Sequence, residues 1–291
     1  MPLITDFLKK KENVHFSDRN NVNDGDKIAI VSLAFRFPGC GENVKLFWEN
    51  LQSGKNFSQI ITERINFDKN YDEVYSTHGH LVENIDMFDH SFFNISELEA
   101  KSMDPIHRIM METAYITLHR AGYDKESLVN QSIGVFVGQC TEEWAQVEHP
   151  VNVYTVTSKC RSITANHVSY VLGLQGPSMT IDTACSSSLS SVACGIQSLK
   201  ENECDAVLMG GANALLSKHS YAPLCVAKML SPDGKCKTFD ASADGYARGD
   251  GFAFILGKKL KNAKKDGDYV WATIEGIGSN QDGNSAVLTA P

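Results

Sequence analysis

The 291-residue chain lacks the features that would assign it to several special classes of protein. No run of about 18 uncharged apolar residues occurs, so no membrane-spanning helix is predicted. The N-terminal stretch MPLITDFLKKKEN carries its lysines after a short apolar segment, which is not the order of an export signal. We therefore expect a cytoplasmic protein. The 27 Lys and Arg against 35 Asp and Glu give a net charge of −8, which predicts no nucleic-acid partner.

The eight cysteines lack the spacing of a metal site or a disulfide framework. No C-x-x-C pair occurs, and five of them are too widely spaced for a zinc knuckle: Cys185, Cys194, Cys204, Cys225 and Cys236. We expect reduced thiols. The loop DASADGYARGDG has Gly251 where a calcium loop needs Glu, and GIGSNQDG has Gln281 in place of the third glycine of a dinucleotide fingerprint. We therefore expect the chain to bind no metal and no cofactor of its own.

What is present is typical of a folded α/β protein. The hydrophobic fraction of 42 % and the charged fraction of 21 % fit a globular chain with a core, in one large domain or two. Residues 1–26 are mostly polar and are interpreted as a tether, in which Pro2–Leu8 is either a short docking helix or part of a disordered tail. The globular part is predicted to begin at Lys27.

Apolar runs alternate with segments of helical period from Lys27 onward. The second of the predicted helices has a capping box at Ser96 and Glu99 and a kink or new start at Pro105, with Asp104 as its N-cap. The alternation indicates a mostly parallel sheet covered on both faces. Strands are predicted at 27–35, 132–140, 178–185, 205–215, 251–260 and 269–278, and helices at 43–53, 97–121 and 158–172.

The segment DTACSSSLSSV, residues 182–192, is the strongest candidate for chemistry. A predicted strand leads into it, and apolar residues recur with helical period from Leu189, so Cys185 is predicted at a strand-to-helix junction. Unpaired N–H groups and the positive end of the helix dipole favour a thiolate there, the state in which cysteine is a nucleophile. The many serines predict a buried helix with room for a substrate channel that reaches Cys185. The alternative, a small buried structural thiol, stays open.

DTACSSSLSSV resembles the nucleophile motif of the β-ketoacyl synthases, in particular the ketosynthase domains of type I polyketide and fatty-acid synthases. Further segments resemble the family in the same order, and together they cover residues 26–291: IAIVSLAFRFPG, MDPIHRIMMETAYITLHRAGYD, VLGLQGPSMTIDTACSSSL, CKTFDASADGYARGDG and SNQDGNSAVLTAP. The resemblance implies a thiolase-like α-β-α-β-α sandwich. Residues 27–268 would be its N-terminal half, and residues 269–291 the truncated start of the C-terminal half.

The resemblance also implies a reaction for Cys185. The thiol would accept an acyl group from the phosphopantetheine arm of an acyl carrier protein, and its backbone N–H would form part of an oxyanion hole. A malonyl thioester on another carrier would then lose CO2, and the resulting carbanion would attack the acyl-enzyme to give a β-ketoacyl thioester. The family is usually homodimeric, so the expected partners are a carrier protein and a second copy of the chain.

The sequence departs from the family in the groups that assist decarboxylation. The family's H-G-T-G-T and N-x-G-H histidines, its active-site lysine and its glycine-rich loop are absent. We therefore expect no condensation by this chain alone, unless a second polypeptide supplies the other half. His167 stands where the family commonly has Arg and is expected to be a packing or surface residue.

Two alternatives remain. A Cys-dependent acyl hydrolase or transferase predicts a histidine within hydrogen-bond reach of Cys185. A non-condensing acyl acceptor or carrier-docking module predicts an unreactive or enclosed thiol. The residues leave open the acyl-chain length, the extender unit, the product, and whether the pathway makes a polyketide or a fatty acid.

Overall fold

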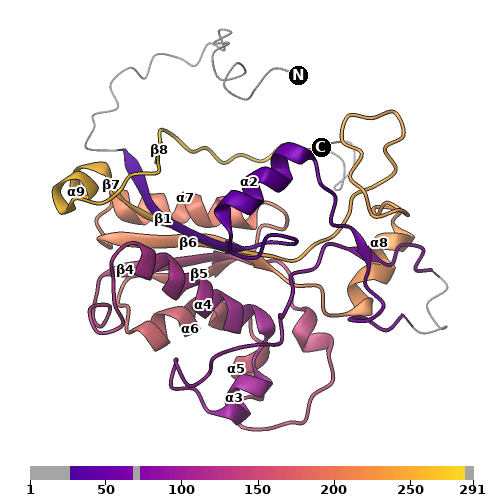
Figure 1. The fold of residues 1–291 in the computed structure, drawn as a ribbon, viewed down its shortest axis with the longest axis horizontal. Coiled ribbons are helices and arrows are strands. Elements are labelled where there is room, and N and C mark those ends of the chain that lie inside the picture. The colour runs from indigo at the N-terminus through magenta and orange to yellow at the C-terminus, as the bar shows by residue number, and fades with distance from the viewer. Residues whose placement is uncertain (1–26, 68–72, 286–291) are drawn as a thin grey trace.

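A six-stranded mixed sheet organises the computed structural model, which describes residues 27–67 and 73–285 (Figure 1). The six strands lie in the order β5-β4-β6-β7-β1-β8. Their runs of β-branched and aromatic residues favour extended backbone, and the central ones are buried on both faces. The bounds are β1 Ile28–Arg36, β4 Ile133–Gly138, β5 Ser178–Ile181, β6 Ala206–Asn213, β7 Gly251–Lys259 and β8 Ala272–Ile274.

The prediction of a mostly parallel sheet is wrong. β4 runs parallel to β5 and β6, but the described pairs β6–β7, β7–β1 and β1–β8 are antiparallel. No α-helix carries the chain back across a face of the sheet between β6 and β7. Instead, residues 214–250 make an excursion beyond the strand ends, with α8 (Tyr221–Val226) and the 3₁₀ turn η3 (Lys218–Ser220) inside it. β7 therefore enters the sheet at the end where β6 leaves it, which requires an antiparallel pair.

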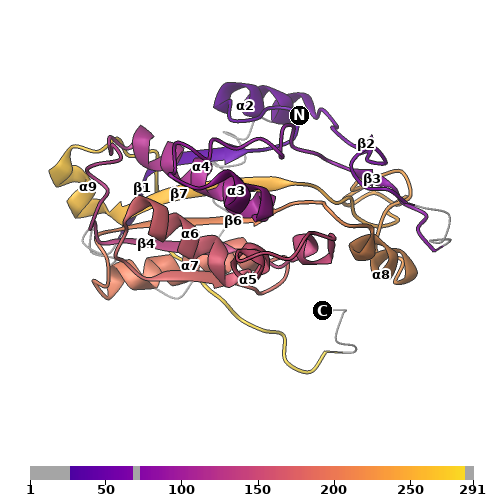
Figure 2. The same cartoon turned by 90° about the horizontal axis from the view of Figure 1, so that it is seen from below.

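Helices cover both faces of this sheet. α4 (Pro105–Arg120) and α6 (Ser162–Leu172) lie on one side of the strands, and α7 (Ser187–Lys200) lies on the other (Figure 1). Alternate residues of β4 accordingly enter two separate core clusters: Val135 and Val137 pack toward α4 and α6, whereas Phe136 packs toward α7. Figure 2 shows the same layers after a quarter turn.

The two long predicted helices are both divided in the structure. The first was expected to restart at Pro105, and α3 (Glu97–Ser102) does end before α4 begins. Asp104 caps α4 by accepting the N–H of Ile106 at 2.8 Å, as predicted. The second was predicted without a break, but α5 (Thr155–Lys159) and α6 are separated by extended backbone at Cys160.

Sequence analysis missed or misjudged several elements of the periphery. The charged stretch after β7 forms the helix α9 (Leu260–Asp266), which was not predicted. The paired strands β2 (Gln59–Ile60) and β3 (His78–Gly79) were not predicted either, because their sequences have no clear period. The strand predicted at 269–278 is only β8, which pairs with β1 of the same sheet. A second domain over residues 269–291 stays a prediction. No helix in the described part of the chain is long and apolar enough to cross a bilayer.

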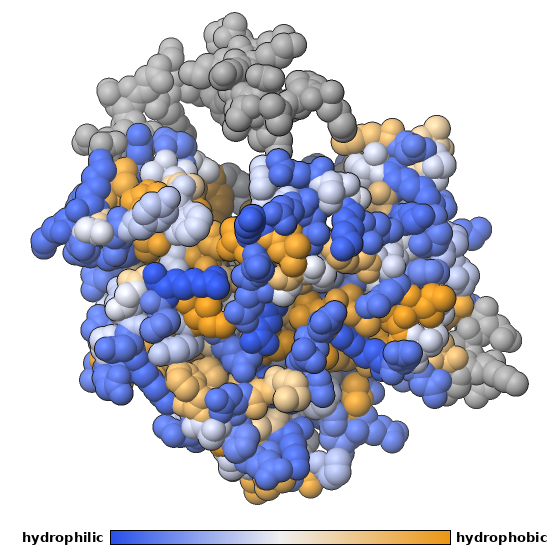
Figure 3. All heavy atoms as spheres, viewed as in Figure 1, coloured by the Kyte–Doolittle hydropathy of each residue, from blue (hydrophilic) through white to orange (hydrophobic). Residues whose placement is uncertain are grey.

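The helix α2 (Val44–Ser53) confirms the prediction of a helix at 43–53, but it has no buried residue. Its ends follow from local chemistry, since the side chain of Asn43 accepts the N–H of Leu46 and Gly54 ends the helix at φ +64°. In Figure 3 apolar surface gathers in the middle of this face of the molecule, around and below α2. The segment 1–26, predicted to be a tether, lies outside the described residues.

Candidate active site

Cys185 lies in a tight turn between strand and helix. β5 ends at Ile181 and α7 begins at Ser187, so the predicted strand is shorter and the helix starts two residues later than Cys185. The residue before the thiol, Ala184, has φ +55°, a left-handed conformation that is unfavourable for a residue with a Cβ. The turn therefore stores strain immediately before Cys185 and reverses the chain into α7.

Short polar side chains hold this turn. The hydroxyl of Ser187 accepts the N–H of Thr183 at 3.0 Å and donates to the carbonyl of Ala184 at 2.5 Å. The hydroxyl of Ser186 donates to the carbonyl of Thr183 at 2.8 Å, and the hydroxyls of Thr183 and Ser190 lie 2.8 Å apart. Serine and threonine suit this position because they satisfy backbone groups locally. The serines therefore stabilise the turn through hydrogen bonds, and their side chains are also small.

Two glycines allow the start of α7 to lie directly on the sheet. A Cβ on Gly138, the last residue of β4, would lie 2.3 Å from the carbonyl carbon of Ser187. A Cβ on Gly211 of β6 would lie 2.7 Å from the Cβ of Ser188. Ser191 completes the contact by donating its hydroxyl to the carbonyl of Gly210 at 2.7 Å. The position of Cys185 is therefore fixed by close backbone packing at the carboxyl ends of β4 and β6.

Arg161, at the start of α6, ties the turn to the loop after β4. Its guanidinium pairs with Asp182, donates to Glu142 at 2.7 Å and reaches the carbonyl of Cys140 at 3.3 Å. Asp182 in turn accepts the N–H of Ala184 at 3.0 Å, which connects the arginine to the strained residue. The N–H bond from Ala184 and the Arg161 partner hold the pKa of Asp182 below its usual range. Sequence analysis did not single out Arg161.

The electrostatic neighbours of Cys185 are Cys140 and Tyr246. Burial raises the pKa of the Cys140 thiol, and electrostatic interactions with Asp182 and Cys185 add to the increase. Burial likewise raises the pKa of Tyr246, with Arg248 acting against the increase and Cys185 adding to it. A thiol from the loop after β4 and a phenol from the 214–250 excursion thus lie within electrostatic reach of Cys185, although their positions are far apart in sequence.

The expected buried helix and substrate channel are not formed by the described residues. Cys185 is exposed, and Leu189, one turn into α7, keeps 70 % of its surface accessible. The reason is that α7 packs on the sheet with one face only, and nothing among residues 27–67 and 73–285 covers the other. The expectation that small residues bury the helix is therefore wrong for this chain, although the predicted strand–cysteine–helix order holds.

His107 and His167 form a separate pair between α4 and α6. Their rings meet edge to face with centroids 5.2 Å apart. Burial lowers the pKa of His107 to about 3 and that of His167 to about 4. Neither nitrogen of His107, nor Nδ1 of His167, hydrogen bonds to Cys185. His167 packs as expected, and this pair gives no support to a Cys–His hydrolase.

Two buried carboxylates close the excursion that carries Tyr246. Asp250 accepts the N–H of Val82 at 2.9 Å and of Leu215 at 2.8 Å, and pairs with Arg64 at 2.5 Å. Glu143 accepts the N–H groups of Leu216 and Ser217 at 2.8 and 2.9 Å. Glu143 also pairs with the buried guanidinium of Arg248 at 2.6 Å. These carboxylates therefore hold both ends of residues 214–250 to each other and to the segments that carry Arg64, Val82 and Glu143.

The chain was compared with protein families, with curated relatives and with solved structures. The model of the β-ketoacyl synthase N-terminal domain matches residues 25–263, which include the turn at Cys185. The chain belongs to the β-ketoacyl synthase family. A partially reducing polyketide synthase of Talaromyces stipitatus, tpeA, is 39 % identical over 284 residues, which are 93 % of this chain and 11 % of that protein. Polyketide synthase PksL of Bacillus subtilis is 39 % identical over 91 % of this chain and 6 % of its own length.

Solved ketosynthases have the same fold. The ketosynthase from module 6 of the bacillaene synthase from Bacillus subtilis, as a cysteine-to-serine mutant, superposes with a TM-score of 0.82 at 39 % identity. The match covers 91 % of this chain and 46 % of that one. An oxazolomycin ketosynthase domain from Streptomyces albus gives a TM-score of 0.75 at 29 % identity, with 85 % and 45 % covered. The thiolase-like assignment is confirmed, and this β-ketoacyl synthase chain spans less than half of each solved ketosynthase.

Proposed function

We propose that this chain is the acyl-accepting half of a ketosynthase. The thiolate of Cys185 attacks the thioester carbonyl of an acyl group carried on the phosphopantetheine arm of an acyl carrier protein. The bond from the carbonyl carbon to the pantetheine sulfur breaks, the arm leaves as a thiolate and takes up a proton, and the acyl group stays on Cys185. The observation that supports this step is an exposed thiol set on a strained turn at the positive end of α7.

The second half-reaction would complete a decarboxylative condensation. A malonyl thioester loses CO2, the carbanion bonds to the acyl carbon, and the Cys185 thiolate leaves, giving a β-ketoacyl thioester two carbons longer. This sequence holds neither the H-G-T-G-T nor the N-x-G-H motif of the family. We therefore propose that the isolated chain is acylated but does not condense.

The exposed face of α7 supports a further part of the proposal. Leu189 and Met179, which are 70 % and 46 % exposed, lie where the described residues leave the helix and the edge strand β5 uncovered. We propose that the remaining half of a ketosynthase covers α7 and forms the channel to Cys185. The working unit would be a cytoplasmic homodimer that meets a carrier protein and needs no cofactor besides the carrier's phosphopantetheine.

Acylation is tested by incubating the full chain with an acyl-pantetheine thioester and locating the adduct by peptide mass spectrometry. We expect one acyl group on Cys185 and none in Cys185→Ala. Cys194→Ala is the matched control, because Cys194 is an exposed cysteine within α7 and its loss should leave the adduct intact.

The other outcomes separate the alternatives. No adduct on the folded chain would contradict acyl transfer and favour a docking module. Adduct formation followed by release of the free acid would favour the hydrolase. A β-keto product formed from malonyl-carrier by the isolated chain would contradict the proposal that condensation needs the missing histidines.

A further inference from the structure

Two adjoining cavities lie beside α2, and Cys185 lines neither of them. The first, here called the polar cavity, has a volume of 530 Å³, and the second, the apolar cavity, has a volume of 330 Å³. They share part of their lining, contributed by Asn50, Leu51, Lys55 and His80. Their volumes fall in the range of small-molecule sites, which is about 300–1,000 Å³.

The polar cavity has an unusual charge for this chain. Lys55, Lys235 and Arg248 line it, and no carboxylate does, although the protein carries a net charge of −8. Arg248 is balanced by Glu143, so the excess positive charge comes from the two lysines. Such a local reversal of sign attracts an anion, and the low-dielectric walls of a cavity strengthen the attraction.

Two carboxylates in the same loop as Lys235 pair with a different lysine. Asp233, two residues before Lys235, pairs with Lys237 at 3.0 Å, and Asp244 pairs with the same lysine at 2.7 Å. The sulfur of Cys236 accepts the N–H of Ala247 at 3.2 Å, which joins the two strands of the loop at the cavity wall. Both carboxylates therefore pair directly with Lys237, and Lys235 interacts with Asp233 only as an additional electrostatic neighbour.

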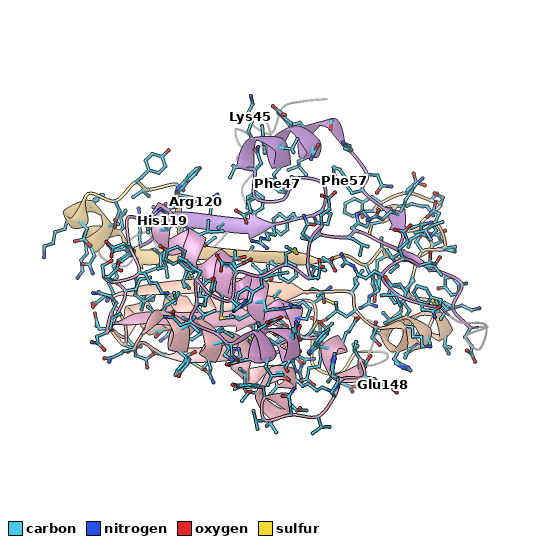
Figure 4. All side chains as sticks on the ribbon, turned by 60° about the horizontal axis from the view of Figure 1, so that its bottom comes forward. Lys45, Phe47, Phe57, His119, Arg120 and Glu148 are labelled. Atoms are coloured by element: carbon cyan, nitrogen blue, oxygen red, sulfur yellow. The ribbon has the colours of Figure 1, made fainter. Side chains whose placement is uncertain are left out.

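The apolar cavity is walled by aromatic rings. Phe37 and Phe47 lie with ring centroids 5.6 Å apart, and Phe35 stacks on Phe37 at 4.8 Å. Phe57 closes the cavity over Gly39, where any Cβ would lie 2.0 Å from the ring. Figure 4 shows Phe47 and Phe57 on the inner side of α2, whereas Lys45 projects from its outer side. An apolar ligand would find rigid, flat walls here.

The walls are held by hydrogen bonds between distant segments. His80 donates its N–H to the carbonyl of Arg248 at 3.0 Å, and Asp250 donates its N–H to the carbonyl of His80 at 2.8 Å. The side chain of Asn50 donates to the carbonyl of Gly39 at 3.2 Å. Asp250 also lines the apolar cavity, but its carboxylate is already taken by Arg64 and two backbone N–H groups. The lining is thus preorganised and offers no free acid to repel an anion.

We propose that the two cavities form one binding site for a small amphiphilic anion. Its phosphate or carboxylate head lies between Lys55 and Lys235, and its apolar tail lies on Phe37, Phe47 and Phe57. The site is separate from the acylation of Cys185, so it stands whether or not the proposed function holds.

Calorimetric titration of the full chain with n-octyl phosphate tests the site. Octanoate identifies which head is preferred, inorganic phosphate measures the head alone, and n-octyltrimethylammonium is the control of opposite charge. Either octyl anion should bind more tightly than phosphate, because the tail adds apolar contact, and the ammonium should not bind.

Matched variants locate the binding. Lys235→Glu should weaken it about ten-fold or more, which corresponds to about 1.4 kcal/mol. Lys45→Glu makes the same change of net charge on the outer face of α2, where the lysine side chain is 87 % exposed, and should change binding less than two-fold. Lys55→Gln gives a second test if Lys235→Glu alters the circular dichroism spectrum. Equal effects of Lys235→Glu and Lys45→Glu, equal binding of the ammonium, or no binding of either octyl anion would overturn the proposal.

Discussion

α4 and α7 cover opposite faces of one sheet, but most residues of α4 are buried, whereas fewer than half of those of α7 are. Of the 16 residues of α4, 11 are buried, including His107 and Arg108. Of the 14 residues of α7, six are buried, and four of those are serine or glycine: Ser187, Ser191, Ser198 and Gly195. The difference shows that α4 completes a hydrophobic core, whereas α7 follows the turn of Cys185 and has one face that the described residues leave uncovered.

Truncation of one apolar side chain in each helix is the strongest test of this contrast. Ile109→Ala in α4 removes a fully buried side chain and should lower the free energy of unfolding by about 2–5 kcal/mol. Leu189→Ala in α7 removes a side chain that is 70 % exposed and should change it by less than about 0.5 kcal/mol. Urea denaturation measures both. A large loss in Leu189→Ala would mean that α7 is covered in solution, for example by a second copy.

The histidine pair on the α4 side should make stability depend on pH. The folded pKa of His107, about 3, lies below its unfolded value of about 6.5, so the unfolded chain gains the proton first as pH falls. Stability is therefore lost below about pH 6.5, by about 2 kcal/mol at pH 5 for this residue. Asp104 acts in the opposite sense, because burial raises its pKa to about 7.

A variant isolates the histidine contribution from that of Asp104. His107→Leu keeps Asp104 and removes the titration, so its unfolding free energy should fall less than that of the wild type between pH 7 and pH 5. Denaturation at the two pH values gives the difference. Equal losses in the two proteins would show that the ring is hydrated or protonated in the fold.

The turn on the α7 side should depend on Arg161 for reactivity more than for stability. Arg161→Gln removes the guanidinium that joins Asp182 and the Cys140 carbonyl, so the turn at Ala184 loses exposed ion-pair contacts worth about 0.2–1 kcal/mol. We expect alkylation of Cys185 by iodoacetamide to slow about ten-fold, with a changed pH profile.

Arg120→Gln is the control for that experiment. Arg120 also donates to a backbone carbonyl, that of Leu33 at 3.0 Å, but it lies at the far end of α4. Its loss should leave the alkylation rate unchanged. If both variants slow the reaction equally, Arg161 has only a general structural role. Restored reactivity in Arg161→Lys would instead assign the effect to charge.

The sequence predicted the elements near Cys185 well because their signals are local. The apolar run of β4, the cap at Asp104 and the helical period after Leu189 each follow from neighbouring residues. The antiparallel half of the sheet was not predicted, since the direction of β7 depends on a long excursion without period. The break at Cys160 has no Pro or Gly to mark it.

The supports of the site were beyond sequence reasoning for a similar reason. Arg161 acts through partners at positions 140, 142 and 182, which meet only when β4 and β5 pair. The exposed face of α7 was not predicted, because the serines of this helix were taken to fit a buried helix. In the structure these serines form hydrogen bonds within the turn and contact the sheet. The local sequence pattern is the same for this arrangement as for a fully buried helix.

The carboxylates Glu143 and Asp250 hold the two ends of the 214–250 excursion in place. Because they bind residues 215–217 at one end and Arg248 at the other, the two ends are held by contacts that do not involve the exposed residues Ala241 and Ser242. Insertion of residues, or cleavage by a protease, at the exposed residues Ala241 and Ser242 should therefore leave the two ends of the excursion joined. The molecule thus has a position for inserting a tag or a reporter peptide without disturbing β6 and β7.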